Sequence, residues 1–354
     1  MNIYFITNKT ASRVWRMLPQ ASFMASMGHK VEVDEFAGAI DVKKIGWADV
    51  IISEMVFDWR IINAIDGTNK KLIYEIDDLQ EVTHPKHYAY KTTHGWQGLR
   101  RRFYLYYFMA KADGFIVTNK LLKKRYTWLT KIGKKKKIFI FPNYLNVPYW
   151  LKPKVPNNSG MIRILWAGGN SHQIDLEYIK PVMKKILKKY KNVKFVYMGY
   201  GGWSSPYSPF PEYNFGHKHV LKELPYEQLH MEQGADFLHY PDKLAQTQCD
   251  IGIAPLVNNK FARYKTPIKA MEYGINHLPT VGSTFMYKDV IIDGVTGFLA
   301  NNQEDFYEKL CKLIEDKELR EKMGEEAYRH VVDKFDMAKH INKWRQIVEY
   351  VVSQ

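Results

Sequence analysis

Short apolar runs alternate with amphipathic stretches from one end of the chain to the other. Runs of this length, rich in isoleucine, valine and phenylalanine, are typical of buried strands, and the stretches between them suit helices. Strands that alternate with helices form parallel sheets covered by helices, so the pattern predicts an α/β fold. The predicted strands are residues 3–7, 30–34, 50–53, 71–76, 114–118 and 137–141 in the first half, and 162–166, 194–198, 236–239, 250–255 and 279–281 in the second.

The length of the chain and one linker-like segment predict two domains. A chain of 354 residues is too long for one ordinary domain and suits two. Residues 145–160 contain three prolines and end in Asn-Asn-Ser-Gly, which is the composition of a linker. We therefore predict doubly wound domains at residues 1–150 and 151–335, and a terminal helix at 336–354 that packs back on the first domain. Two such domains form a cleft where the carboxyl ends of their strands face each other.

The composition excludes several classes of protein. A hydrophobic content of 46% with 14% aromatic residues is too high for a disordered chain. Cys249 and Cys311 match no metal-binding or redox spacing, which favours a reducing compartment. We see neither a signal sequence nor the roughly 18 consecutive apolar residues that a membrane span needs. The expected location is the cytoplasm. There the protein is either free or bound at the inner membrane surface or on nucleic acid.

The net charge of +15 lies almost entirely in the first half of the chain. Residues 1–155 hold 26 Lys and Arg against 13 Asp and Glu, whereas residues 156–354 hold 26 against 24. Residues 82–155 alone contain 17 basic residues, 16 aromatic residues and a single acid, Asp113. This distribution predicts that the first domain meets an anionic partner or an anionic surface.

Three arginines beside an aromatic run mark this basic segment. Arg100, Arg101 and Arg102 precede Phe-Tyr-Leu-Tyr-Tyr-Phe at residues 103–108. Cations interleaved with aromatic rings suit a nucleic acid with exposed bases. The same composition suits an amphipathic helix on an anionic membrane, and a buried helix with a solvated basic end is a third interpretation. The sequence leaves these three open.

Residues 261–274 contain the most informative motif of the second half. Thr266 is a suitable N-cap, Pro267 suits the first helical position, and Gly274 ends the predicted helix. The free N–H groups at a helix start bind phosphate, and Arg263 and Lys265 add cationic side chains there. Glu272, near the helix end, is a candidate acceptor for ribose hydroxyls. The alternative is an ordinary capped surface helix.

Two adjacent carboxylates end a predicted strand of the first domain. Asp77 and Asp78 follow residues 71–76, so they point into the predicted cleft. We favour a general base or a group that orients an acceptor hydroxyl. A metal site and an exposed acidic turn are the alternatives, and no further metal ligands are evident. Five histidines also lack the spacing of metal ligands and are expected on the surface or in the core: His84, His87, His94, His217 and His219. Arg13 and Arg16 reach the same cleft and are candidates to contact donor or acceptor, the alternative being solvated charge.

The order of these motifs resembles the GT-B glycosyltransferases, in particular the retaining family 4 (group 1) enzymes. Glu272 matches the second of two glutamates that the family places eight residues apart, but Tyr264 stands at the first. This departure concerns the family's contact to the donor sugar and leaves the ribose role of Glu272 in place. Further resemblance lies in residues 112–117, 141–144, 250–255, 278–282 and 293–299, so that most of the chain is covered.

The resemblance implies a UDP-sugar donor, no metal and no other cofactor. It places the loop with Gly168, Gly169, Asn170 and His172 near the diphosphate, and residues 237–240, ending in Tyr240, near the nucleobase. The family's usual Arg and Lys after this loop are absent, and His172 and Asp175 are nearby instead. In a retaining reaction the leaving phosphate oxygen takes the acceptor proton, whereas an inverting reaction requires Asp77 or Asp78 as the base.

The acceptor is the open question. A lipid-linked or surface glycan is the usual acceptor of the resembled family. A hydroxymethylated base in DNA fits the basic aromatic segment nearly as well. A non-catalytic nucleic-acid-binding protein on the same fold is the alternative from another class, and Tyr264 at the position of a family glutamate favours it.

Overall fold

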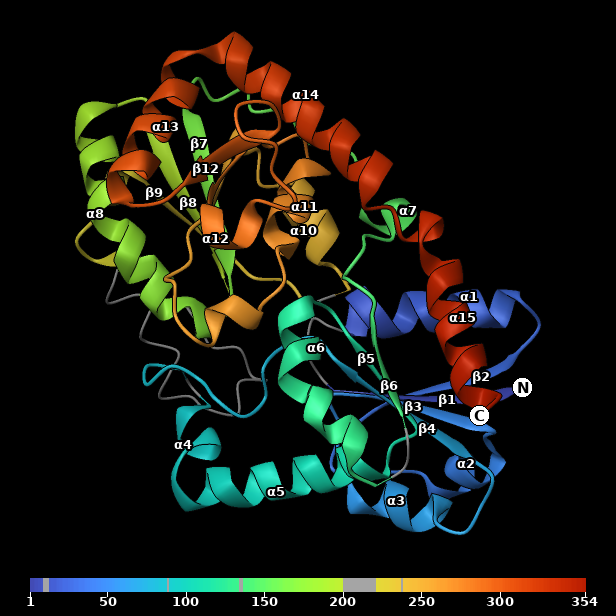
Figure 1. Cartoon of the computed structure of the whole chain (residues 1–354). Helices are drawn as coiled ribbons and strands as arrows, with labels where there is room; N and C mark the ends of the chain where they lie inside the picture. The colour runs from blue at the N-terminus through green and yellow to red at the C-terminus, as the bar shows by residue number, and fades with distance from the viewer. Residues whose placement is uncertain (9–12, 88, 134–135, 200–220, 237) are drawn as a thin grey trace.

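The computed structural model describes the whole chain except residues 9–12, 88, 134–135, 200–220 and 237. Two parallel six-stranded sheets organise it, one above the other in Figure 1. The first sheet has the strand order β2-β1-β3-β4-β5-β6. Its strands are β1 (Asn2–Thr7), β2 (Lys30–Glu35), β3 (Val50–Glu54), β4 (Lys71–Ile76), β5 (Gly114–Val117) and β6 (Lys137–Ile140).

The second sheet has the order β12-β11-β10-β7-β8-β9 and is also parallel throughout. The strand predicted at residues 236–239 is wrong, because Leu238 and His239 lie in a turn and the edge strand is β9. Strand β12 was not predicted. The strands are β7 (Ile162–Gly168), β8 (Val193–Gly199), β9 (Leu229–Gln233), β10 (Ile251–Ala254), β11 (Thr280–Ser283) and β12 (Gly297–Ala300).

Helices cover both faces of the first sheet. The lower face in Figure 1 packs against α2 (Val42–Trp47), α3 (Trp59–Ile65), α5 (Gly95–Lys111) and α6 (Lys120–Tyr126). The upper face packs against a π-helical turn, η1 (Arg13–Met17), α1 (Leu18–Ser26) and the terminal helix α15 (Ile341–Val352). Trp344 of α15 is fully buried and stacks on Phe5 of β1, so the end of the chain completes the first domain.

The second sheet is covered in the same way. On one face, α8 (Gln173–Lys189) and α13 (Gln303–Glu315) form one core with the sheet. On the other face lie α10 (Tyr240–Ala245), α11 (Ile268–Gly274), α12 (Thr284–Tyr287) and α14 (Lys317–Lys334). The shorter helices of the described chain are α4 (Tyr90–Thr93), η2 (Thr127–Lys131), α7 (Val147–Trp150), η3 (Asn170–His172), η5 (Tyr226–Gln228), η6 (Ala262–Tyr264) and η7 (Met337–Lys339).

The chain crosses between the domains twice, and the two crossings are hydrogen-bonded to each other. Leu145 N donates to Phe335 O (2.8 Å), and Met337 N donates to Leu145 O (2.7 Å). Tyr144 stacks on His340 at 3.9 Å between ring centroids. The two connections therefore form one joint beside the first sheet. In the described part of the chain, no helix is both long and apolar enough to cross a bilayer.

Candidate functional site

The carboxyl ends of the two sheets meet at the junction of the domains. Lys265 Nζ, just before α11, lies 3.7 Å from Asp78 Oδ2, which follows β4. Asn119 Nδ2, at the start of α6, donates to Tyr264 O (2.9 Å), and Asn143 Nδ2 donates to Thr266 Oγ1 (3.1 Å). The structure therefore brings the two motifs that were singled out in the two halves of the sequence into contact.

The first-domain side of the junction is acidic. Burial raises the pKa of Asp77 well above its usual range; the Asp78 and Glu54 carboxylates add to this, and Arg16 and Lys265 oppose it. Thr118 Oγ1 of the next strand end donates to the Asp77 carbonyl (3.0 Å). A raised pKa favours a neutral carboxyl group, which can donate a hydrogen bond to a hydroxyl group or to the ring oxygen of a sugar.

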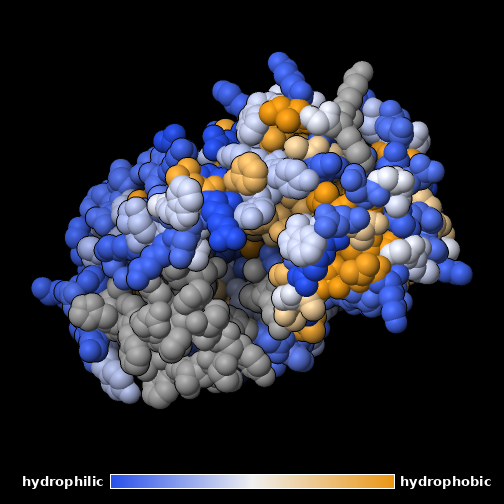
Figure 2. Space-filling view, turned by 90° about the horizontal axis from the view of Figure 1, so that it is seen from below, coloured by the Kyte–Doolittle hydropathy of each residue, from blue (hydrophilic) through white to orange (hydrophobic). Residues whose placement is uncertain are grey.

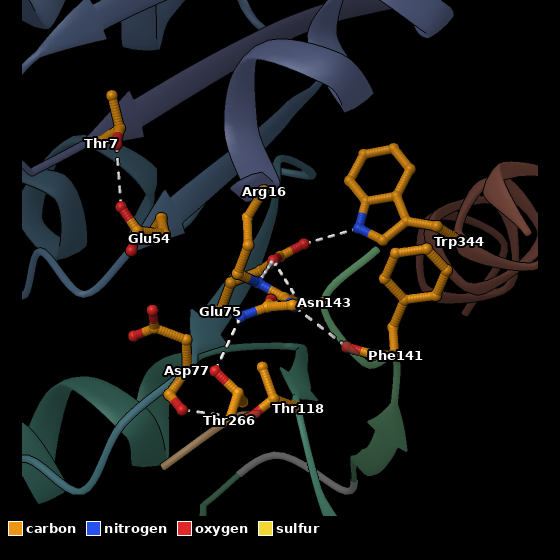
Figure 3. A network of polar contacts seen from close by, with 10 residues as sticks. All are labelled: Thr7, Arg16, Glu54, Glu75, Asp77, Thr118, Phe141, Asn143, Thr266 and Trp344. Carbon is orange, nitrogen blue, oxygen red and sulfur yellow. Dashed lines mark hydrogen bonds and ion pairs between the residues drawn. The ribbon is translucent and has the colours of Figure 1, made fainter. Parts of the chain in front are cut away.

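Glu54 belongs to this acidic group and was not predicted. It ends β3, is fully buried, and accepts a hydrogen bond from Thr7 Oγ1 at the end of β1 (2.8 Å). Figure 3 shows the Glu54 and Asp77 carboxyl groups on the same side of the sheet. The available signal was an acid in the last position of an otherwise apolar strand, at the edge where parallel sheets bind ligands.

On the second-domain side, Glu272 and Tyr240 lie together. Glu272 is 4% exposed, its pKa is raised by burial, and Tyr240 Oη donates to Glu272 Oε2 (3.2 Å). The predicted N-cap is wrong: Pro267 occupies the cap position, and the Thr266 hydroxyl accepts from Asn143 instead. Because α11 has only seven residues, its start contributes little to anion binding compared with the nearby cations.

Two lysines rather than one face the junction. Lys265 lies over the Phe261 ring at 4.8 Å, whereas Arg263 is exposed and donates to Asn258 Oδ1 (2.7 Å). Lys269, the second residue of α11, is half-buried. Burial lowers its pKa, the Lys265 charge adds to this, and Glu272 and Asp175 oppose it. Lys269 was not predicted; the available signal was a second lysine four residues after Lys265 in the same motif.

The glycine-rich loop follows directly from β7. A Cβ on Gly168 would lie 2.7 Å from the Trp166 ring, while one on Gly169 would meet no atom within 4 Å. His172 Nδ1 lies 2.8 Å from Asp175 Oδ2, and Val257 N donates to Asp175 Oδ1 (2.7 Å). The side chain of Asn170 and Phe237 of the predicted nucleobase segment lie outside the described residues.

We expect Asp175 to make the stability depend on pH. Burial raises the pKa of Asp175 to about 6. Between pH about 4 and 6 the folded protein therefore keeps a proton on this carboxyl group that the unfolded chain has already lost. This contribution favours folding at low pH and is lost as the pH rises through 6. The free energy of unfolding of the wild type relative to Asp175→Asn should fall by up to about 1.4 kcal/mol per pH unit in that window. Urea unfolding at pH 4, 5, 6 and 7 measures it, and parallel pH profiles would contradict the assignment.

Arg16 lies inside the first domain and not in the junction. Its Nε donates to Glu75 Oε2 (2.9 Å), and its Nη1 donates to Phe141 O (3.0 Å) and Asn143 Oδ1 (2.8 Å). Trp344 Nε1 donates to the other Glu75 oxygen (2.6 Å). Figure 3 shows this network joining β4, the segment after β6 and α15. The predicted contact of Arg16 with a ligand and its alternative of solvated charge are both wrong, because the side chain is fully buried.

The other predicted arginines and the histidines differ in their surroundings. Arg13 forms an ion pair with Glu35 at the end of β2. Arg100 is exposed over Tyr104, Arg101 donates to the Gln80 carbonyl, and Arg102 is half-buried. His87, expected on the surface or in the core, is buried against Phe261 across the junction, and burial lowers its pKa to about 3; His217 and His219 lie outside the described residues.

Tyr264 has a structural role at the position where the resembled family has its first glutamate. Its side chain packs against the apolar core of the first domain, and its carbonyl accepts from Asn119. The loop before α11 is therefore anchored to the opposite domain. Among the described residues, no group of three His, Cys, Asp or Glu side chains is arranged to hold a metal ion.

A family model described as glycosyl transferases group 1 matches residues 162–316, which contain the glycine-rich loop, Lys265 and Glu272. The second domain is a group 1 glycosyltransferase domain. The prediction of a glycosyltransferase that resembles this group is thereby confirmed. The matched domain is the one that contains the motifs predicted to bind the donor. No curated protein sequence matches the chain.

Solved structures confirm the GT-B fold of the whole chain. A sucrose-phosphate synthase from Thermosynechococcus elongatus superposes with a TM-score of 0.69 at 12% identity, covering 100% of this chain and 99% of that one. A glycosyltransferase from Rickettsia africae gives 0.66 at 15% identity, covering 99% and 98%. HepE from Anabaena, solved with UDP, gives 0.63 at 14% identity, covering 100% of both chains. At these identities the likeness concerns the fold.

Proposed function

We propose that this glycosyltransferase moves a sugar from a UDP-sugar to a hydroxyl group of an anionic or membrane-presented glycan, with retention and without a metal ion. The observation that carries the proposal is the contact of Lys265 with Asp78, which joins the cations of the second domain to the carboxylates of the first. HepE, which shares the fold, was solved with UDP and with UDP-glucose, which supports the choice of nucleotide.

The charges suggest how the reaction proceeds. Lys265 and Lys269 supply fixed positive charge where the diphosphate leaves, which lowers the energy of the developing anion. Glu272 accepts from the ribose hydroxyls, while Gly169 leaves room for the backbone to approach the phosphates. The raised pKa of Asp77 favours a neutral carboxyl that orients the acceptor. Retention needs no protein base, because the leaving phosphate oxygen takes the acceptor proton.

The activity test uses a panel of UDP-, GDP- and TDP-sugars. We expect release of UDP from one or more UDP-sugars, slowly with water alone and faster with lipid-linked or surface glycans as acceptors. Failure of every sugar nucleotide to bind and to react would overturn the proposal. DNA with hydroxymethylated bases belongs in the same panel, because the basic and aromatic surface of α5 and α6 favours it as the second candidate acceptor. Binding of DNA without any turnover would favour the non-catalytic alternative.

Glu272→Gln tests the ribose contact. We expect an affinity for UDP about tenfold lower, because a charge-assisted hydrogen bond becomes a neutral one. The fold should persist, since the amide oxygen still accepts from Tyr240. Isothermal titration with UDP gives the affinity, and Glu308→Gln, exposed on α13, is the matched control. Equal affinities of the wild type and Glu272→Gln would remove Glu272 from the donor site.

A further inference from the structure

The outer face of α5 is apolar and has no partner in the described structure. Six residues form this face: Trp96, Leu99, Arg100, Phe103, Tyr104 and Tyr107. At 100° per residue they occupy an arc of about 140°, opposite the buried Leu105 and Met109. Trp96 is 80% exposed, Phe103 68% and Leu99 54%. A monomeric protein rarely exposes so many large apolar side chains together unless they bind something.

The charged residues of α5 itself are all basic, although Asp66 lies 3.8 Å from Lys111 at the end of the helix. The seventeen residues of α5 include three arginines and Lys111 but no acid. The adjacent α6 adds Lys120, Lys123, Lys124 and Arg125, and Asp113 is the only acid in residues 82–155. Arg100 and Lys111 lie over the rings of Tyr104 and Tyr107. Figure 2 views the molecule from the side of α5 and shows hydrophobic side chains among hydrophilic ones.

We propose that the outer face of α5 docks the protein onto an anionic lipid bilayer. Aromatic and aliphatic side chains on one helix face, flanked by cations, match the boundary between acyl chains and anionic headgroups. A nucleic acid is a poorer match. Single-stranded nucleic acids bind in grooves lined by cations, whereas this is the convex side of one helix with a single arginine among its exposed apolar residues.

Other side chains of the same helix contact the segment that follows the Asp77–Asp78 pair. Arg101 donates to the Gln80 carbonyl, and Tyr106 Oη donates to Glu81 Oε1 (2.9 Å). Gln80 and Glu81 follow shortly after the Asp77–Asp78 pair. Docking through the outer face would therefore hold the acceptor side of the junction near the membrane surface. This consequence rests on the proposed function, whereas the docking itself does not.

Co-sedimentation with vesicles tests the proposal on the full chain. We expect binding to equimolar phosphatidylglycerol and phosphatidylcholine and about tenfold weaker binding to phosphatidylcholine alone. The double variant Trp96→Ser/Phe103→Ser should lose about tenfold or more of its affinity for the anionic vesicles, because two aromatic side chains no longer enter the bilayer. Tyr226→Ser, with an 88% exposed side chain in the second domain, is the matched control and should bind as the wild type does.

Three results would overturn the docking proposal. The first is unchanged vesicle binding by the double variant. The second is a loss of affinity for single-stranded DNA while vesicle binding is unchanged. The third is a wild-type protein that sediments as a dimer through this face, with the double variant a monomer and vesicle binding unchanged. Circular dichroism shows whether the variant is folded, which is expected because both side chains are exposed. Release of UDP in vesicle-free solution separates the two proposals: activity without docking overturns only the inference, and docking without binding of any sugar nucleotide overturns only the function.

Discussion

The Arg16→Met substitution is expected to lower the free energy of unfolding by about 3–5 kcal/mol relative to the wild type. The arginine and its partner Glu75 are both fully buried, with Nη2 2.8 Å from Oε2. Removing the guanidinium leaves the Glu75 carboxylate inside the domain with the Trp344 indole as its only donor among the described residues. It also removes the two hydrogen bonds to Phe141 and Asn143, which follow β6. Urea unfolding followed by circular dichroism measures the loss.

Two further variants show whether the buried charge is the cause. Arg13→Met removes an arginine whose side chain is partly exposed, and it should cost at most about 1 kcal/mol. The double variant Arg16→Met/Glu75→Gln removes both charges, while the amide oxygen that it introduces can still accept from Trp344. It should be more stable than the sum of the single losses predicts. A loss of under about 1 kcal/mol in Arg16→Met alone would contradict the assignment.

The same network shows where sequence patterns stop being informative. Strand β4 was predicted with the bounds that the structure has, because its apolar run lies between two lysines and two aspartates. The pattern does not reveal that Glu75 within it faces Arg16, 59 residues away. An acid inside a strand has the same appearance in the sequence whether it lies in solvent or in a buried ion pair. Only the packing of α15 and the linker over the sheet distinguishes the two.

The errors in the second domain have local physical causes. Strand β9 lies at the edge of its sheet and alternates apolar with polar residues, so no continuous apolar run marks it. The short apolar stretch at residues 237–238 was interpreted as that strand instead. Thr266 and Pro267 have the residue types of a helix start, but the Asn143 side chain from the other domain binds the threonine hydroxyl. A tertiary contact thus overrides a local preference.

The candidate site was predicted in its parts and not in its assembly. Asp78 and Lys265 were each singled out on motifs far apart in the sequence, and the structure brings them together because both follow strands whose carboxyl ends face the junction. Lys269 was missed because a lysine in a short helix is usually solvated. Tyr264 was recognised as a departure from the family pattern, and its anchoring role required the first-domain core that it packs against.

Replacing Lys265 by methionine is expected to lower kcat/KM for sugar transfer by about 10²–10³-fold. The side chain is 15% exposed and positioned between the two domains, so its charge acts in a partly desolvated site. Methionine keeps most of the volume and removes the charge. Lys265→Arg should recover part of the activity, because it restores a cation at a different geometry. The measurement is steady-state release of UDP from the UDP-sugar identified by the panel.

Binding of UDP distinguishes a contact to the diphosphate from a contact that only joins the domains. If Lys265 binds the diphosphate, Lys265→Met should weaken UDP about tenfold or more, because a phosphate oxygen loses its charged donor. Asp78→Asn should leave UDP affinity unchanged or raise it, since it removes an anion that competes for the same ammonium group. Lys260→Met, exposed in the same loop, controls for general charge. Equal losses in Lys265→Met and Asp78→Asn would instead assign Lys265 to the joint between the domains and leave Lys269 as the cation of the donor site.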